Sequence, residues 1–259
     1  MYHSLIFQPT DGSKSYHTWE DWHLIPSSRP TFAAPELKER VIDIPGADGV
    51  IDLTDAFANT PIYQNRQGSF EFIVMNDFGD WQTRYSEIMN LIHGRRVKVF
   101  PVDDDPAYFY LGRVVVNEWK SEPINSIITI DYSLDPYKYL RWSSMVPWLW
   151  DPFNFENGVI REYYNISVSD LAQSEFLFVG SRRYSPLKFV IHRSSNLTVS
   201  VKENRSGATF SSPAKLPNVS SGSAESVFVW EDFVAKDKEY ILKFTGTGVI
   251  SIDYREGSL

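Results

Sequence analysis

The histidines are the first residues in this sequence that could do acid–base chemistry near neutral pH. Nucleophilic catalysis needs such a base within hydrogen-bond reach of an activated oxygen or sulfur. His23 lies two residues after Asp21, but no serine in a G-x-S-x-G or similar motif accompanies the pair. The neighbouring Trp19 and Trp22 favour a polar tip on an aromatic segment instead. The other histidines are scattered along the chain: His3, His17, His93 and His192. The sequence therefore predicts no catalytic residue.

Carboxylates could serve as metal ligands or as an acid–base pair. The acidic run Asp103 to Asp105 lacks the spaced D-x-D-x-D-G pattern of a calcium loop, and we interpret it as a solvated turn between two strands. The chain has no cysteine, which excludes zinc fingers and a thiol nucleophile. Phosphate-cradling glycine motifs are absent, and none of the 33 acidic residues can be singled out for glycoside hydrolysis. We therefore predict no metal, no cofactor and no enzymatic activity.

Trp230 is the residue that could contact a saccharide. It ends an alternating run over residues 227–230, and the flat face of an indole ring can stack on the C–H groups of a sugar. A tryptophan in such a strand more often packs in a core or at an edge. The sequence leaves both interpretations open.

Composition and charge narrow the class of protein. The 259 residues include 25 basic and 33 acidic side chains, and the net charge of -8 argues against nucleic acid as a partner. No stretch reaches the roughly 18 apolar residues of a membrane span, and the N-terminus lacks the pattern of a signal peptide. Hydrophobic residues at 42% indicate a folded chain, while aromatic residues at 15% suit pleated sheets and interfaces.

Period-two alternation dominates the chain and predicts short strands. Ile128, Ile130 and Tyr132 alternate with polar residues, as in a strand with one buried face. Turn residues separate similar runs, a spacing that is typical of antiparallel sandwiches or barrels. The predicted strands cover residues 70–74, 97–100, 108–116, 128–134, 176–179, 187–191, 197–201, 227–230, 240–244 and 249–254.

One segment has helical periodicity instead. A helix that packs on a sheet is predicted over about residues 77–93, with Gly94 as its C-terminal cap. Four large side chains share one face at helical spacing: Trp81, Tyr85, Ile88 and Ile92.

Residues 29–66 contain four prolines and two glycines, too many for a regular element. Within them, residues 41–44 and 50–53 are apolar enough to pair across the turn PGADG. A long segment of this kind either is disordered or contacts another surface, and its apolar content favours contact.

The domain boundary is predicted near Tyr139, which gives an N-terminal domain of residues 1–139 and a C-terminal domain of residues 140–259. Prolines interrupt regular structure just beyond it. Trp142, Trp148 and Trp150 indicate that the connecting segment is packed rather than flexible.

Several segments stand out by their order and spacing: MYHSLIFQP at the start and residues 18–30, 41–57, 65–72, 85–99, 108–139 and 246–259. Together they resemble the distal tail protein (Dit) family of long-tailed bacteriophages. The resemblance implies a mainly β fold. An α+β, β-sandwich-type N-terminal domain would carry one α-helix and a protruding β-hairpin arm (about residues 41–57), and a galectin-like β-sandwich would follow.

The resemblance also implies a non-enzymatic structural hub in the virion of a siphovirus or prophage. Family members form a hexameric ring at the distal end of the tail, which is assembled in the host cytoplasm. The ring joins the tail tube protein to the tail-associated tip protein and to receptor-binding proteins. Because the arms lie on neighbouring subunits, the expected ring contacts are Val41, Ile42, Ile44, Pro45, Val50, Ile51 and Leu53.

Two points remain open at the level of the sequence. Arg95 and Arg96 follow the predicted helix and either pair with carboxylates of the next subunit or tube, or form a solvated basic turn. The alternative function is a carbohydrate-binding module, in which the C-terminal sandwich attaches to host cell-wall saccharide, with Trp230 as the contact. Fold alone does not decide between the two functions.

Overall fold

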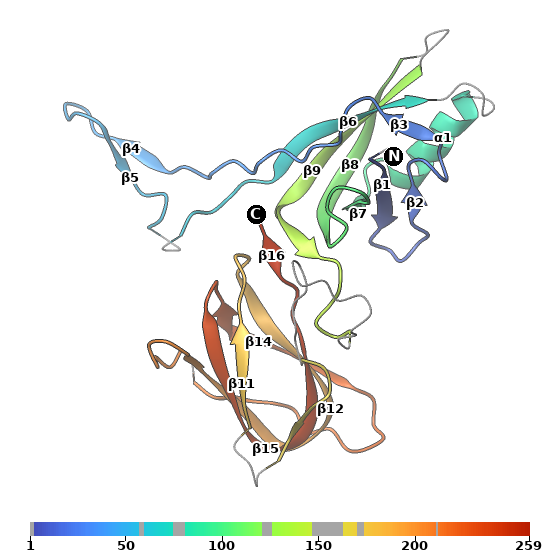
Figure 1. Cartoon of the computed structure of the whole chain (residues 1–259). Coiled ribbons are helices and arrows are strands. Elements are labelled where there is room, and N and C mark those ends of the chain that lie inside the picture. Colours follow the sequence, from blue (N-terminus) through green and yellow to red (C-terminus); the bar gives the residue numbers. More distant parts are fainter. Residues whose placement is uncertain are drawn as a thin grey trace. The chain divides into compact units, whose positions relative to one another are not determined.

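Two compact units make up the chain, residues 1–139 together with Leu259, and residues 140–258. The computed structural model describes residues 3–56, 60–74, 81–120, 126–146, 163–169, 174–210 and 212–259 (Figure 1). Of the aromatic segment predicted after Tyr139, Trp142 is 48% exposed. Trp148 and Trp150 lie outside the described residues.

The N-terminal unit is built on one curled sheet with the strand order β2-β1-β7-β8-β9-β6-β3. Every second residue faces the core from Phe70 to Val74 in β6 and from Ser126 to Leu134 in β9. Phe70 pairs with Ile130, and Phe72 pairs with Ile128. This register matches the alternation seen in the sequence and confirms a mainly β fold. The strands are β1 (Leu5–Pro9), β2 (Tyr16–His17), β3 (Leu24–Pro26), β6 (Arg66–Val74), β7 (Arg96–Pro101), β8 (Tyr108–Lys120) and β9 (Ser126–Leu140).

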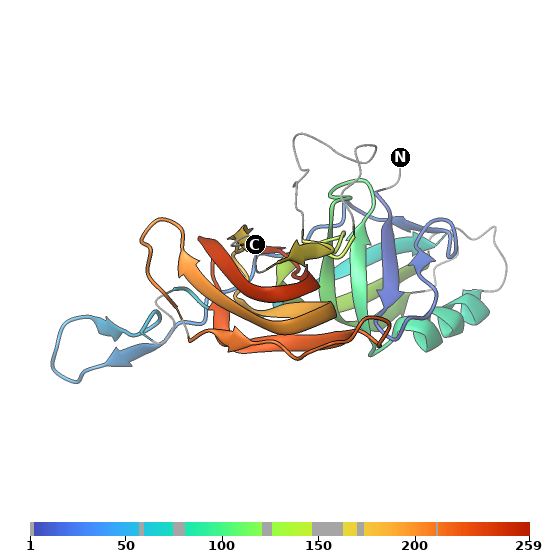
Figure 2. The same cartoon turned by 90° about the horizontal axis from the view of Figure 1, so that it is seen from below.

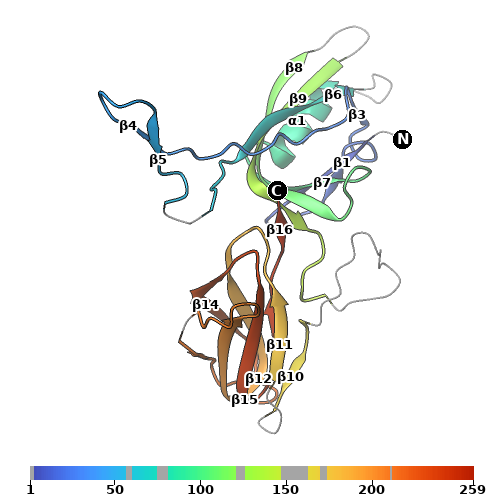
Figure 3. The ribbon, with the colours of Figure 1, turned by 60° about the vertical axis from the view of Figure 1, so that its left-hand side comes forward.

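Helix α1 (Trp81–Ile92) packs against this sheet, as Figures 2 and 3 show. Ile88 and Ile92 are fully buried, while Trp81 and Tyr85 pack half-buried against the same core. The predicted helical face is therefore confirmed. Gly94 ends the helix with a φ of 70°, a left-handed conformation that glycine adopts without strain. The predicted start at residues 77–80 lies outside the described residues.

The C-terminal unit holds a second antiparallel sheet with the order β10-β15-β12-β13, in which β11 also pairs with β15 and β14 with β12. Its core is a single cluster that includes Phe178, Phe189, Trp230 and Tyr240. The strands of this sheet are β10 (Ile166–Val168), β11 (Ser174–Val179), β12 (Ser185–Glu203), β13 (Ala214–Lys215), β14 (Ser226–Ala235) and β15 (Glu239–Asp253). The short strand β16 (Gly257–Ser258) is not part of it.

Two strands of this sheet are longer than the sequence predicts. The two strands predicted at residues 187–191 and 197–201 are parts of one continuous strand, β12. Those predicted at residues 240–244 and 249–254 are parts of β15. Register shifts in β12 after Ile191 and after Ser195 accommodate the polar residues that looked like a break. Gly246 resembles a turn residue, but it lies inside β15. Glycine is needed at this position because a side chain there would collide with the backbone of Asn196.

A separate two-stranded sheet consists of β4 (Val41–Asp43) and β5 (Val50–Asp52). It can be followed in blue in Figure 1. Phe57, the predicted end of this segment, lies outside the described residues.

Candidate functional site: the hairpin arm and its surroundings

The segment β4–β5, here called the arm, is an antiparallel hairpin. Ile42 pairs with Ile51, and the flanking pairs are Val41 with Asp52 and Asp43 with Val50. The turn PGADG closes it, and Gly46 and Gly49 have φ values of 87° and 79°. Only glycine adopts such values readily, so the turn predicted from the sequence is confirmed together with its chemical reason.

The side chains of the arm are exposed on both of its faces. Exposed fractions are 54% for Val41, 50% for Ile42, 58% for Val50 and 46% for Ile51. A two-stranded hairpin that is bare on both sides is marginally stable in water, and exposed apolar side chains gathered in one place mark an interaction site. Of the seven predicted contact residues, six are exposed and Leu53 is half-buried; the other two exposed residues are Ile44 and Pro45.

Both strands of the arm have nearly the same sequence, VIDI over residues 41–44 and VIDL over residues 50–53. Directly paired residues share a face, so the register gives the arm two faces of different chemistry. The isoleucine face carries Ile42 and Ile51. The Val/Asp face carries two valines and two carboxylates: Val41, Asp43, Val50 and Asp52.

Charge adds a second property to the arm. Residues 41–55 contain four aspartates, Asp43, Asp48, Asp52 and Asp55, and no lysine, arginine or histidine, so this segment carries a formal charge of -4. A surface that combines apolar side chains with concentrated negative charge fits a partner that is apolar and cationic.

Hydrogen bonds at its base hold the arm in register. The amide of Leu53 donates to the carbonyl of Arg40 at 2.7 Å, and the amide of Arg40 donates to Oγ1 of Thr54 at 3.1 Å. Thr54 is buried, and its amide donates to Oδ1 of Asp52 at 2.8 Å. Hydrogen bonds from Thr54 also lower the pKa of Asp52, which keeps this carboxylate charged.

A paired stem links the arm to the sheet. The amide of Lys38 donates to the carbonyl of Ile62 at 2.8 Å, and the amide of Gln64 donates to that of Glu36 at 2.7 Å. Before the stem, the ring of Phe32 stacks on that of Tyr110 at a centroid distance of 3.8 Å.

Arg66 fastens the chain segment that precedes the stem. It is buried, and its guanidinium donates to the carbonyls of Ala33 at 2.7 Å and Pro136 at 2.9 Å. Burial lowers the pKa of Arg66, but the two carbonyls satisfy its N–H donors. The chain on the N-terminal side of the arm is thus fastened to the core of its unit.

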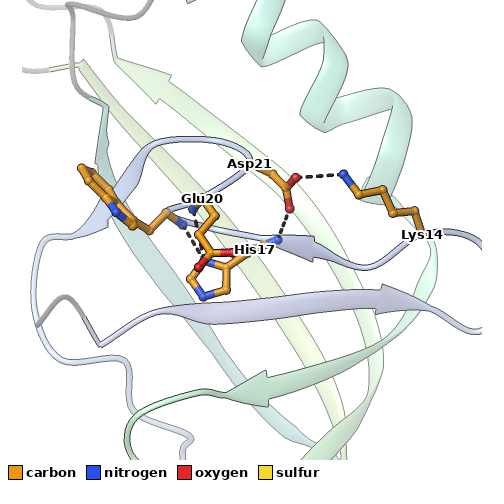
Figure 4. A network of polar contacts seen from close by, with 5 residues as sticks. Lys14, His17, Glu20 and Asp21 are labelled. Carbon is orange, nitrogen blue, oxygen red and sulfur yellow. Dashed lines mark hydrogen bonds and ion pairs between the residues drawn. The ribbon is translucent and has the colours of Figure 1, made fainter.

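The Asp21 and His23 pair drawn from the sequence is engaged otherwise. The carboxylate of Asp21 accepts the amide of His17 at 2.7 Å and Nζ of Lys14 at 2.9 Å (Figure 4). In return, Nδ1 of His17 accepts the amides of Trp19 and Glu20, both at 3.2 Å. These reciprocal bonds close a tight turn, and the pKa of Asp21 is lowered, mainly by the hydrogen bond from the His17 amide. The arrangement is structural.

The acidic run at residues 103–105 forms the turn between β7 and β8 and binds cations of the chain itself. Asp104 lies 2.5 Å from the guanidinium of Arg29, and Asp105 lies 2.7 Å from Nζ of Lys138. Asp103 accepts the amide of Ser4 at 3.1 Å. Because each carboxylate has such a partner, the run does not form a ligand shell. No group of metal ligands occurs among the described residues.

A relay that sequence reasoning missed joins Ser251, His192 and Glu225. Nε2 of His192 lies 2.8 Å from Oγ of Ser251, and Nδ1 lies 2.7 Å from Oε1 of Glu225. The order serine, histidine, carboxylate is that of a hydrolytic triad. Ser251 is fully buried, however, and its Oγ accepts the amide of Asn165 at 2.9 Å, so a substrate cannot reach it. The pairing of β12 with β15 brings His192 to Ser251, and the pairing of β12 with β14 brings it to Glu225, which sequence spacing does not reveal.

Trp230, the possible saccharide contact named from the sequence, lies in the core of the C-terminal unit. It is 2% exposed and packs on Phe233 at a centroid distance of 5.4 Å. Its position on β14 points it inward, because β14 pairs with β12 through Leu187, which is also fully buried. A ring enclosed in this way cannot stack on a sugar.

A depression in the C-terminal unit is lined by charged side chains that satisfy one another. Glu203 lies 3.1 Å from Nζ of Lys238 and accepts the hydroxyl of Ser206 at 3.0 Å. Asn204 donates to Glu239 at 3.1 Å. The groups are therefore used within the fold.

Within the described residues, no helix has the length and apolar character needed to span a membrane.

Comparison with known proteins shows a likeness in fold to a solved structure. No family model matches the sequence, and no curated protein sequence matches it significantly. Among solved structures, the chain is similar to the crystal structure of the SPP1 Dit (gp 19.1) protein, described as a paradigm of hub adsorption apparatus in phages that infect Gram-positive bacteria. The TM-score is 0.56 at 14% identity, with 98% of this chain and 99% of that chain covered. Over nearly its whole length, the chain therefore has the fold of the SPP1 Dit protein.

Proposed function

We propose that this protein is the distal tail protein of a long-tailed phage or prophage, a non-enzymatic hub at the tail tip. Six copies form a ring that joins the tail tube protein to the tip protein and to receptor-binding proteins. The observation that carries the proposal is the likeness in fold to a phage adsorption hub across 98% of the chain. The exposed arm supports it independently.

The physical argument starts from the arm. The apolar side chains are half exposed on both faces of the hairpin, and covering them with a partner stabilises the complex. Main-chain pairing with the partner can add to this stabilisation. A contact between the arm of one copy and a different surface of the next copy is heterologous. Such contacts either run on as an open filament or close as a ring. A ring of six leaves no arm uncovered.

The polar clusters are used within the fold. The carboxylates weighed as acid–base or metal-binding candidates, Asp21 and Asp104, bind cations or amides of the chain, and the serine of the relay is buried. These contacts support a structural role. The lack of cysteine fits a virion component that is assembled in the reducing cytoplasm of the host and is held together by contact area.

Particle mass in solution tests the proposal. Native mass spectrometry should find a six-copy species, and negative-stain images should show a ring. Replacing residues 41–57 by a short Gly/Ser linker should abolish it while both units stay folded by circular dichroism. A monomer at all concentrations that also ignores purified tail tube protein would contradict the proposal. Trp230, the residue on which the alternative of saccharide binding depends, is enclosed in the core, which favours the hub over that alternative.

A further inference from the structure

Two arginines face each other on the sheet of the N-terminal unit. Arg96 of β7 and Arg113 of β8 are direct cross-strand partners, and both are exposed. Like charges directly opposite each other destabilise a sheet unless an anion compensates them. Arg95 precedes Arg96 and is exposed as well. These three residues are called the arginine ladder here.

The chain compensates only part of this charge. Arg96 lies 3.3 Å from Oδ2 of Asp135, and Arg95 lies 3.4 Å from Oδ2 of Asp11. Arg113 donates to the carbonyl of Gly94, and no carboxylate of the described part of the chain forms an ion pair with it. The ladder thus keeps positive charge that an external anion would neutralise.

Apolar side chains accompany the ladder. Alternation along β8 places Val115 on the same face as Arg113, and Val115 is 39% exposed. Leu111, two residues before Arg113, is half-buried on that face. The surface therefore combines arginine with aliphatic side chains, as the Val/Asp face of the arm combines carboxylate with valine.

We propose that the Val/Asp face of the arm of one copy docks on the arginine ladder of the next copy, with Asp43 against Arg113. This inference rests on the proposed ring and names the surfaces that form it. The Val/Asp face is exposed in the single chain, which leaves it available for contact with another copy. The arm carries a formal charge of -4, and the uncompensated charge of the ladder is positive. This opposite sign orients two copies as they approach and disfavours contacts between two arms or between two ladders.

The test uses two variants with opposite charge reversals, Asp43→Arg and Arg113→Glu. Asp43 is preferable to Asp52, whose carboxylate holds the base of the arm. Alone, each variant should assemble at least about tenfold more weakly than wild type, because every contact in its ring sets like charges together. Mixed in equal amounts, they should form alternating rings to within about threefold of wild type, because each contact is then either original or fully exchanged.

Controls separate this inference from the proposed function. Glu231→Arg makes the same charge change as Asp43→Arg, but on an exposed residue of β14, and it should not alter assembly. Wild-type assembly should also weaken about tenfold between roughly 0.05 M and 0.5 M salt, a readout that needs no variant. Wild-type rings that ignore salt, or mixed variants that stay apart, would overturn the docking while leaving the ring intact. A wild type that never assembles, even with tail tube protein, overturns both.

Discussion

Replacing Ile42 and Ile51 by serine removes the isoleucine face of the arm without touching the core of either unit. The two side chains are 50% and 46% exposed and pair across the hairpin. Docking of the Val/Asp face leaves the isoleucine face available to a second surface of the neighbouring copy. If the ring covers this second face of the arm too, the double variant should lose assembly while the single chain keeps its stability. Few substitutions separate these two quantities so cleanly.

The size of the effect follows from the exposed fractions. Complete burial of an isoleucine side chain stabilises by about 1.5–3 kcal/mol, so covering the exposed half of each contributes about 0.75–1.5 kcal/mol. Two residues give about 1.5–3 kcal/mol for each arm contact, which corresponds to a roughly 10- to 150-fold weaker association. Losing the Ile42–Ile51 pair costs at most about 1 kcal/mol, and this cost is confined to the hairpin.

The assay measures oligomer fraction against protein concentration by native mass spectrometry and unfolding temperature by calorimetry. Val227→Ser with Val229→Ser is the matched control, because these β14 residues are 56% and 41% exposed and lie outside the N-terminal unit. The control should assemble normally. A double arm variant that forms rings at wild-type concentrations would refute the reasoning, and so would one whose main unfolding transition drops by several degrees.

Three further predictions concern the fold. Gly246→Ala should destabilise the C-terminal unit by about 3 kcal/mol in chemical denaturation, because its φ is 98° and a Cβ would collide with Asn196; Gly207→Ala, with open space at a φ of 68°, should cost only about 1 kcal/mol. Asp21→Ala should lower the unfolding temperature at pH 7, where the lowered pKa keeps the carboxylate ionised. The difference from wild type should vanish as the pH falls from the ordinary value of 3.8 through the lowered one, and a constant difference at all pH values would contradict this origin. Trp230→Ala should cost about 3–5 kcal/mol as a core cavity, while Trp230→Phe should leave any cell-wall binding unchanged, and loss of binding in the folded Phe variant would restore the saccharide contact.

The parts of the fold that repeat locally could be predicted from the sequence. Ile128 and Ile130 alternate with polar neighbours and are fully buried in β9, and Ile88 and Ile92 mark the buried face of the helix. The hairpin follows from a glycine-containing turn between two apolar runs. In each case the signal lies within a few residues, because period and turn chemistry are local properties.

Features that depend on pairing between distant strands could not be predicted. The break seen at residues 192–196 is a pair of register shifts inside β12, opposite Gly248 of β15. The relay of Ser251 with His192 and Glu225 requires that register together with the pairing of β12 with β14. The arginine ladder was visible only as Arg95 and Arg96, since Arg113 joins it through the pairing of β7 with β8. The sequence contains the residues, but the register decides which of them meet.

The repeated sequence of the arm has a consequence for solubility before assembly. Each strand of this hairpin has an edge with unpaired backbone groups, and both edges present nearly the same side chains in the same order. Such edges are templates for unwanted strand addition and aggregation. Asp43 and Asp52 are the last residues of β4 and β5, where they would repel the same residues of another unassembled arm. The carboxylates that fit a cationic surface would thus also keep newly made chains apart until that surface is available.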